Sequence, residues 1–409
     1  MKIVLFITSL ILLLSFQAPA SEAPQVEREP AAIPKNSKAP WKPIPIDGVE
    51  LSFVYKGEFS RVFSGGVDSQ NSYLENLDIK LAIDAEKAMN WTGASFFLYG
   101  LGDRGSQPTN SPSFNVGDLQ GVSNIETSRS AFKLYEAWYQ QKFWDGKASV
   151  LLGLHDLNSE FYVTDTSTLF FNSSFGIGNE MAQTGVNGPS IFPTTTTAVR
   201  LQIEPTPWFY FQVASFNAQA GDPEASEDSH LRSFGNDGTL LISEAGFVSD
   251  IDGNAGKYSV GTWGYDHSFA HLNNSGEHNK SVGSYLLIDH PLSQNQSVFL
   301  RYGVASQETN AVHSNLSGGY VIKDPFHLNE QDRMGVAFAQ ASLGDAYREA
   351  LSAEGSESEA QETTYELNYR FHVLPGLVLQ PDYQYIVNPS GLKASKDAHY
   401  GALRVEIYY

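Results

Sequence analysis

Cysteine is absent from this chain of 409 residues. A chain without cysteine has no disulfide framework, no thiolate metal site and no cysteine nucleophile. Basic residues are scarce as well, because 26 Lys and Arg stand against 46 Asp and Glu and give a formal net charge of -20. Such an acidic chain is a poor match for nucleic acid, whose phosphates demand a basic surface.

Long hydrophobic runs are missing too, apart from one at the start of the chain. Ile3 to Phe16 is apolar, follows the positive Lys2 and precedes Ala18-Pro19-Ala20. This pattern predicts a secretory signal peptide, residues 1–20, cleaved after Ala20; cleavage after Ala23 and an uncleaved anchor are the alternatives. Because no second run of this kind is present, the sequence excludes a helical protein of the inner membrane.

Helix-forming stretches are rare in the rest of the chain. Residues 24–45 contain six prolines, so this stretch is neither helix nor central strand, and residues 21–48 are expected to form an extended leader. From residue 49 to 409 the chain becomes a series of short alternating segments separated by clusters of Gly, Asn, Asp and Pro. We expect these residues to form one all-β domain.

In the clearest segments, apolar residues alternate with polar ones at a period of two. The apolar sets are Leu77, Ile79, Leu81 and Ile83; Ala148, Val150, Leu152 and Leu154; Val199, Leu201 and Ile203; and Val298, Leu300, Tyr302 and Val304. This period places one face of each strand against an apolar medium and the other in a polar one. A soluble β-sandwich and a transmembrane barrel both have such strands.

Three features favour the barrel: the export signal, charges of both signs on the polar face, and the end of the chain. Leu403, Val405 and Ile407 alternate with polar residues, and the chain stops at Tyr409. A terminal strand that ends in an aromatic residue resembles the signal of bacterial outer-membrane barrels, which makes the barrel assembly machinery an expected partner of Tyr409. The predicted location is the bacterial outer membrane, with lipid around the barrel.

The length of the domain sets the size of the barrel. At roughly 20–25 residues per strand and connection, residues 50–409 provide about 16 antiparallel strands, enough to leave an aqueous channel. One connection is far longer than a turn, since about forty residues separate the strands at 147–155 and 197–205. Long loops in compact proteins are usually functional, and we expect this one to fold into the lumen as a constriction loop.

At this point the chain resembles the OprB family of carbohydrate-selective outer-membrane porins. The matching stretches are Gly117–Ile125 (GDLQGVSNI), Leu134–Gln141 (LYEAWYQQ), Asp156–Phe161 (DLNSEF), Phe171–Gly176 (FNSSFG), Gly188–Pro193 (GPSIFP), Tyr369-Arg370, Pro375–Leu377 (PGL), Gln380–Ile386 (QPDYQYI) and Asn388-Pro389. The resemblance covers residues 117–409. It implies a 16-stranded barrel that passes small solutes, above all glucose-like sugars.

Two features depart from the family pattern. Glucose-passing relatives have a basic constriction, whereas this chain has few cations and a large acidic excess. The leader is also short. The acidic excess keeps a second possibility open, a porin of the same fold that prefers cations or amino acids, because acidic rings attract cations.

Several polar residues are candidates for lining the pore. Arg200, Arg301 and Arg370 lie on the polar faces of alternating segments, where a guanidinium can bind sugar hydroxyls or anions. The alternative is that they pair with wall carboxylates such as Glu204 and Glu366. In the long loop, Asn158, Glu160 and Asn172 are candidates for solute contact, since their side chains offer defined hydrogen-bonding groups.

Other residues leave alternatives open. The aromatic side chains of the long loop, such as Phe161, Phe170 and Phe175, either stack on sugar rings or pin the loop to the wall. Glu136 shares its alternation face with Phe132, Leu134 and Trp138, which places it toward lipid unless a bulge intervenes or the strand begins later.

The partial motifs for cofactor and metal binding in this sequence do not support such a site. Gly100 to Gly105 fits G-x-G-x-x-G, but a loop and not a helix comes after it. Asp250 to Asn254 lacks the rest of a calcium loop, and the pair His267 and His271 is not on a helix. No cofactor, metal or catalytic residue is therefore predicted.

The sequence thus predicts a porin that passes small solutes by diffusion, as a monomer or a trimer, and not an enzyme. Carbohydrates are the expected solutes, and the cation- or amino-acid-preferring porin is the alternative. Less favoured are a barrel enzyme, for which no Ser/His or Asp/His motif is present, and a secreted all-β adhesin.

Overall fold

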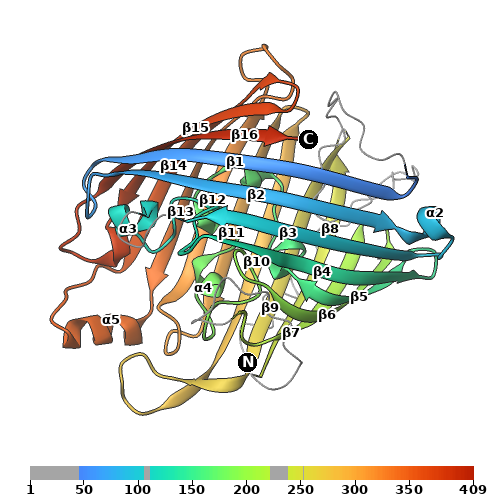
Figure 1. Cartoon of the computed structure of the whole chain (residues 1–409). Helices are drawn as coiled ribbons and strands as arrows, with labels where there is room; N and C mark the ends of the chain where they lie inside the picture. Colours follow the sequence, from blue (N-terminus) through green and yellow to red (C-terminus); the bar gives the residue numbers. More distant parts are fainter. Residues whose placement is uncertain (1–45, 106–110, 222–237, 252) are drawn as a thin grey trace.

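The structure is a computed structural model and describes residues 46–105, 111–221, 238–251 and 253–409. In these residues sixteen antiparallel strands close into a barrel, each bonded to its neighbours in the chain and β1 bonded to β16 (Figure 1). The transmembrane antiparallel barrel of about 16 strands predicted from the sequence is thereby confirmed. The predicted signal peptide and residues 21–45 of the predicted leader lie outside the described residues.

Every strand pairs with the next one in the chain. They are β1 (Val49–Ser64), β2 (Asn71–Asp84), β3 (Ala94–Arg104), β4 (Ala131–Phe143), β5 (Ala148–His155), β6 (Thr196–Thr206), β7 (Phe209–Asn217), β8 (Thr239–Ile251), β9 (Asn254–Ala270), β10 (His278–Ser293), β11 (Gln296–Ala305), β12 (Val312–Lys323), β13 (Arg333–Leu343), β14 (Gln361–Leu374), β15 (Leu377–Val387) and β16 (Ala398–Tyr408).

The two ends of the barrel differ in their connections. At one end tight turns join the strands, such as residues 207–208 and 375–376, and the same end holds the start of β1 and the end of β16. Longer connections stand at the other end (Figure 1). Short turns are periplasmic and longer loops extracellular in barrels of this kind, so Tyr409 lies at the periplasmic end.

Helices occur only as short pieces within the connections of the described chain. They are α2 (Ala85–Met89), α3 (Pro112–Val116), α4 (Asn179–Ala182), α5 (Asp345–Ala353) and the 3-10 turns η3 (Leu157–Ser159), η4 (Thr166–Leu169), η5 (Ser173–Phe175) and η6 (Pro389–Gly391). None of the helices in the described ranges is long and apolar enough to cross a membrane.

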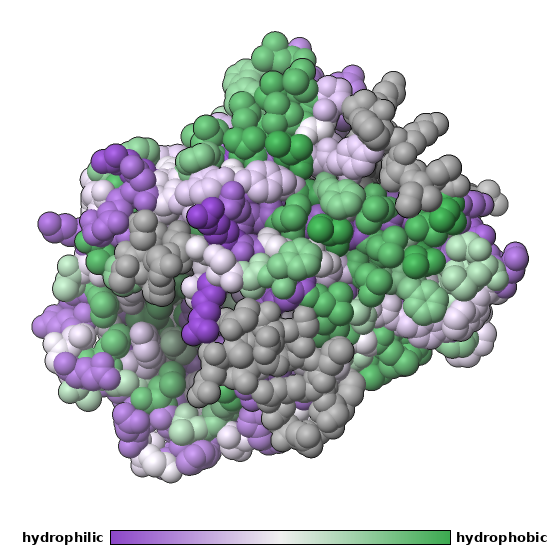
Figure 2. Space-filling view, viewed as in Figure 1, coloured by the Kyte–Doolittle hydropathy of each residue, from purple (hydrophilic) through white to green (hydrophobic). Residues whose placement is uncertain are grey.

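The outer wall is apolar and the inner wall polar, as the alternation predicted. Val199 is 38% exposed and Leu300 is 41% exposed, whereas their strand neighbours Arg200 and Arg301 are each 1% exposed inside the barrel. Hydrophobic side chains spread over the wall between the two ends, and hydrophilic ones gather at the left, near the longer loops (Figure 2). This is the distribution of a barrel that stands in lipid around a polar lumen.

Glu136 points into the barrel because β4 contains an irregularity. The pairing of β3 with β4 shifts between Tyr99 and Gly100, so Tyr99 faces Glu136 while Gly100 faces Leu134. The intervening Tyr135 is the extra residue of a bulge, which moves Glu136 and Trp138 to the inner face. The bulge that was one of the two explanations for Glu136 is thus present. It keeps the carboxylate of Glu136 out of the lipid.

Candidate functional site

The long connection between β5 and β6, residues 156–195, lies inside the barrel and is named the inner loop. Its aromatic side chains are buried against the inner wall: Phe161 and Tyr162 pack with Phe216 and Trp263, while Phe170 and Phe175 pack against Phe299. Phe161 and Tyr162 are fully buried, and Phe170 and Phe175 are each 1% exposed. These rings therefore pin the loop to the wall.

Carboxylates of the wall hold the backbone of the inner loop. Each accepts hydrogen bonds from backbone N–H groups that no strand neighbour could satisfy. The bonds run from Tyr162 N to Glu244 Oε2 (3.1 Å), from Thr166 N to Asp289 Oδ2 (3.0 Å), from Phe171 N to Glu366 Oε1 (2.6 Å) and from Asn172 N to Glu366 Oε2 (2.9 Å). Three carboxylates of the inner wall are thus engaged by the loop.

Inward-facing glycines give the inner loop room to approach the wall. A Cβ atom on Gly303 of β11 would lie 1.7 Å from Glu180 Oε1 and 2.5 Å from the Tyr162 hydroxyl. A Cβ on Gly335 of β13 would lie 2.7 Å from the Phe170 ring. Both contacts are shorter than real Cβ atoms show, so a larger residue at either position would force the side chains of the inner loop to shift.

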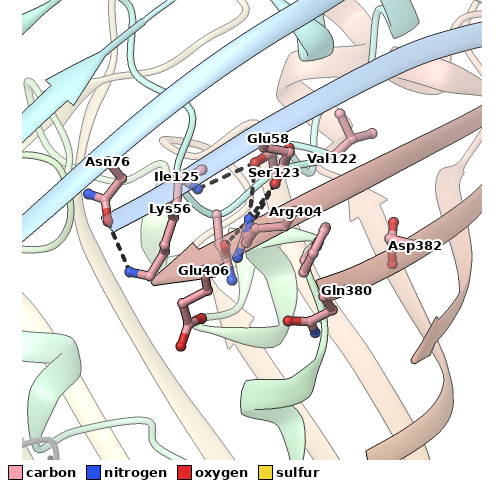
Figure 3. A network of polar contacts seen from close by, with 12 residues as sticks. Lys56, Glu58, Asn76, Val122, Ser123, Ile125, Gln380, Asp382, Arg404 and Glu406 are labelled. Carbon is pink, nitrogen blue, oxygen red and sulfur yellow. Dashed lines mark hydrogen bonds and ion pairs between the residues drawn. The ribbon is translucent and has the colours of Figure 1, made fainter. Parts of the chain in front are cut away.

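Residues 111–130, named the second loop, also reach the inner wall. Glu362 of β14 accepts hydrogen bonds from Leu119 N (2.8 Å) and Gln120 N (3.1 Å). Arg404 of β16 bonds Asn124 Oδ1 at 2.9 Å, and both Ser123 and Arg404 appear in Figure 3. Sequence reasoning found only one in-folded loop; the length of the connection between β3 and β4 was the available signal for this one.

Arg404 also joins the first and last strands of the barrel. Its Nε and Nη2 atoms donate to Glu58 Oε2 at 2.9 and 2.6 Å, so an ion pair links β16 to β1 (Figure 3). The guanidinium carbon lies 3.7 Å from the centre of the Phe171 ring in the inner loop. One side chain therefore touches the seam of the barrel and both in-folded loops.

Arg200 is buried in a network of charged groups. Its Nε and Nη2 atoms donate to the two oxygens of Glu160 at 2.8 and 2.6 Å. His155 stands between Glu160 (3.1 Å) and Glu136 (2.9 Å), and links this pair to β4. Burial opposes the ionisation of Glu160, but Arg200 and His155 outweigh it and hold the pKa of Glu160 below its usual range.

Arg301 is buried without a carboxylate at ion-pair distance in the described residues. It donates to the carbonyl oxygens of Phe175 and Gly176, the latter at 3.0 Å, and its guanidinium carbon lies 4.7 Å from the centre of the Tyr162 ring. All three partners belong to the inner loop. Arg301 thus acts as a further anchor for that loop.

The asparagines of the inner loop support its shape. Asn158 donates to the carbonyl oxygens of Phe161 and Gly176, both at 3.1 Å. Asn172 is fully buried; its side chain accepts from Ser174 N at 3.1 Å and donates to Gln384 at 3.3 Å. Their polar atoms are used within the protein, and a solute-binding role for them stays a prediction.

Arg370 lies differently from the other two arginines. It pairs with Glu406 through two bonds of 3.0 and 2.6 Å and bonds Gln380 at 3.0 Å, and its side chain keeps 23% of its surface exposed. It faces a cavity of about 440 Å³ between residues 165–169 of the inner loop and the wall at the periplasmic end. We call this cavity, which Asn254, Gln294, Gln296, Lys323, Arg333 and Arg370 help to line, the vestibule.

A barrel with an apolar outer wall and a polar lumen narrowed by in-folded loops is an outer-membrane porin. The sequence profile of the carbohydrate-selective porin family OprB matches residues 69–409, so the chain belongs to that family. The match begins well before residue 117, where the family motifs of the sequence start. The protein is accordingly a porin of the outer membrane that lets small hydrophilic solutes diffuse through its lumen.

Individual relatives agree with this assignment. Porin B of Pseudomonas aeruginosa is 22% identical, and the alignment covers 88% of each chain. A high-pH structure of OprB from Pseudomonas putida superposes with a TM-score of 0.78 at 21% identity, over 88% of this chain and 94% of that one. The outer-membrane channel DcaP of Acinetobacter baumannii has a TM-score of 0.56 at 10% identity, over 88% of this chain and 97% of that one.

Proposed function

We propose that the solutes of this porin are sugars of monosaccharide size, passed unchanged and without catalysis, and that they bind loosely in the vestibule. The observation that carries the proposal is the vestibule itself. Its volume, about 440 Å³, lies at the small end of the roughly 300–1,000 Å³ typical of small-molecule sites. Amide, hydroxyl and guanidinium groups line it, and these are the partners that sugar hydroxyls require.

We assign different roles to the candidate residues. Arg370 faces the vestibule and keeps part of its side-chain surface accessible, so it contacts the solute. The other candidates form their hydrogen bonds with groups of the protein itself. They are Arg200, Arg301, Glu160, Asn158 and Asn172. Their role is to fix the inner loop, and through it the width of the channel.

The end of the chain supports the predicted partner at Tyr409. Its backbone pairs with Phe53 of β1, with N–O distances of 3.0 and 2.8 Å, at the periplasmic end. A terminal strand presented at this end is placed for recognition by the barrel assembly machinery. A monomer and a trimer both remain compatible with this arrangement.

The test is single-channel recording of the purified porin in a planar bilayer. Glucose is expected to block the current, and Arg370→Gln is expected to weaken that block. Arg61→Gln, which removes the same charge from an exposed position on β1, should leave it unchanged. Block by arginine alone would favour the cation- or amino-acid-preferring porin, and equal glucose block in both variants would contradict the role of Arg370.

A further inference from the structure

Three basic residues stand in a row across the inner wall of the vestibule. Lys323 of β12 is the direct cross-strand partner of Arg333 of β13, and Arg333 is the direct partner of Arg370 of β14. All three line the vestibule. Like charges directly opposite each other destabilise a sheet, so this row is costly unless a negative group lies against it.

Most basic residues of the lumen have such a negative group in the protein. Arg200 pairs with Glu160, Lys257 with Glu244 and Arg404 with Glu58. The third residue of the row obeys this rule, since Arg370 pairs with Glu406.

Arg301 departs from this rule but is buried against carbonyl oxygens of the inner loop, whereas Lys323 and Arg333 depart from it while lining the vestibule. Within the described residues neither nitrogen group forms an ion pair with a carboxylate. Lys323 Nζ lies 3.5 Å from Asn254 Oδ1, and Arg333 Nη1 donates to the backbone carbonyl oxygens of residues 330–332, at 2.9 to 3.2 Å. Two adjacent cations therefore face a roomy cavity, and neither has a carboxylate at ion-pair distance in the described residues, although Asp165 and Asp289 line other parts of the cavity.

We infer that Lys323 and Arg333 bind the anionic group of an acidic sugar in the vestibule. The inference rests on the proposed function, because it takes the vestibule as the place where sugars pause. A guanidinium offers paired donors that match a carboxylate, and the ammonium of Lys323 adds a second charge beside it. Phosphate shares this chemistry, so the site is assigned to sugars that carry an oxyanion.

The rest of the vestibule suits the uncharged part of such a ligand. The side-chain amides of Asn254, Gln294 and Gln296 offer donors and acceptors for hydroxyl groups. Asp289 is occupied by the hydroxyl and backbone of Thr166, which leaves it less able to repel an anion. The cavity thus combines a basic corner with amide groups, and the carboxylates of Asp165 and Asp289 complete its polar lining.

The experiment compares block by glucuronate, glucose and acetate in single-channel recordings of the porin. Glucuronate is expected to block the wild type more tightly than glucose or acetate. The double variant Lys323→Gln and Arg333→Gln should weaken glucuronate block by roughly tenfold or more, the scale of one lost charge-assisted interaction, and should weaken glucose block by a clearly smaller factor, because glucose carries no anionic group. Arg333→Lys, which keeps the charge without the fork, should fall between.

A matched control removes two charges from the same end of the barrel. Lys87→Gln and Lys147→Gln lie in exposed connections there and should change no block. Retained glucose block shows that the double variant is folded. Tighter block by glucose 6-phosphate that depends on the same two residues would also support the site and assign its anion as phosphate.

Several results would overturn the inference. Glucuronate block that survives the double variant, or that acetate matches, would show no sugar-acid site. If glucose blocks the wild type and glucuronate blocks no better, the inference fails while the sugar porin stands. If no sugar blocks an open channel, the proposed function fails as well.

Discussion

Arg200 carries its charge into the interior of the barrel, and its fork bonds both oxygens of Glu160. Removing one partner of a buried pair leaves the other charge uncompensated, which costs about 3–5 kcal/mol, whereas replacing both by apolar residues is often close to neutral. We expect Arg200→Met to lower the free energy of unfolding by about 3 kcal/mol. Urea unfolding in lipid vesicles measures it.

The double variant Arg200→Met and Glu160→Met provides the comparison. It should be more stable than Arg200→Met alone, because the stranded carboxylate is gone. A double variant that is less stable than the single one would show that Glu160 is needed chiefly for His155, which it also bonds.

Glu180 of the inner loop makes the free energy of unfolding depend on pH. Burial raises its pKa to about 7 from an ordinary value of 4.5, although the Tyr162 hydroxyl donates to it. Between these two values the folded protein keeps a proton that the unfolded chain has released, so stability from this group falls as pH rises and levels off above pH 7. The loss amounts to about 3 kcal/mol.

Glu180→Gln should therefore flatten this part of the pH profile. Urea midpoints at pH 5 and pH 8, compared between wild type and variant, give the measurement. The wild type should lose more stability than the variant on going to pH 8. The same change in both proteins would contradict a titration of Glu180.

At the scale of residues, the sequence predicted which face of a strand a side chain lies on better than it predicted the residue with which that side chain pairs. Alternation alone placed Arg200, Arg301 and Arg370 on the inner face, because a period of two leaves no other choice in a strand. It could not pair Arg370 with Glu406, which is 36 positions away. Such pairs depend on the order and register of the strands, which appear only once the barrel closes.

At the scale of elements, the inner loop packs against glycines of the barrel wall. A larger residue at such a glycine is therefore expected to displace the loop. Gly303→Ala would place a Cβ atom within 1.7 Å of Glu180, and overpacking of this kind costs about 1–3 kcal/mol. The loop is expected to shift toward the channel axis or detach, so single-channel conductance should change and current noise should rise. Single-channel recordings in a planar bilayer measure both the conductance and the current noise.

Gly100→Ala is the control for this substitution. Gly100 faces outward, and the nearest atom to its Cβ would be Phe132 Cζ at an ordinary 3.4 Å. Its conductance should equal that of the wild type. If both variants conduct alike, docking at Gly303 does not set the width of the channel.

The elements were predictable to unequal degrees. The inner loop was expected in the lumen because its forty residues exceed any turn. The residues that hold it were not predictable, since Glu366 and Phe171 are 195 positions apart. The bulge at Tyr135 was only one of two open explanations for Glu136.

For the whole molecule, net charge is a poor guide to ion selectivity. The chain carries a formal charge of -20, yet the lumen carboxylates at Glu244, Glu362 and Glu366 are bonded by backbone N–H groups. Lys323 and Arg333 face the channel instead. We expect reversal potentials in dilute potassium chloride to show a preference for anions.

Screening provides the check on this prediction. The Debye length falls from about 10 Å at 0.1 M to about 3 Å at 1 M salt, so the preference should shrink as salt is raised. Lys323→Gln with Arg333→Gln should shift the reversal potential toward cations. Cation preference in the unaltered protein would contradict the prediction and favour the alternative porin.

The contacts of Arg404 have a consequence for biogenesis. Its partner Glu58 lies in the first strand and Arg404 in the last, so this bond forms only after the whole domain has been delivered to the membrane. The same side chain receives both in-folded loops, through Asn124 and the Phe171 ring. Closure of the barrel and placement of the two in-folded loops thus depend on the same side chain, so a barrel that closes through this ion pair closes with its lumen already narrowed.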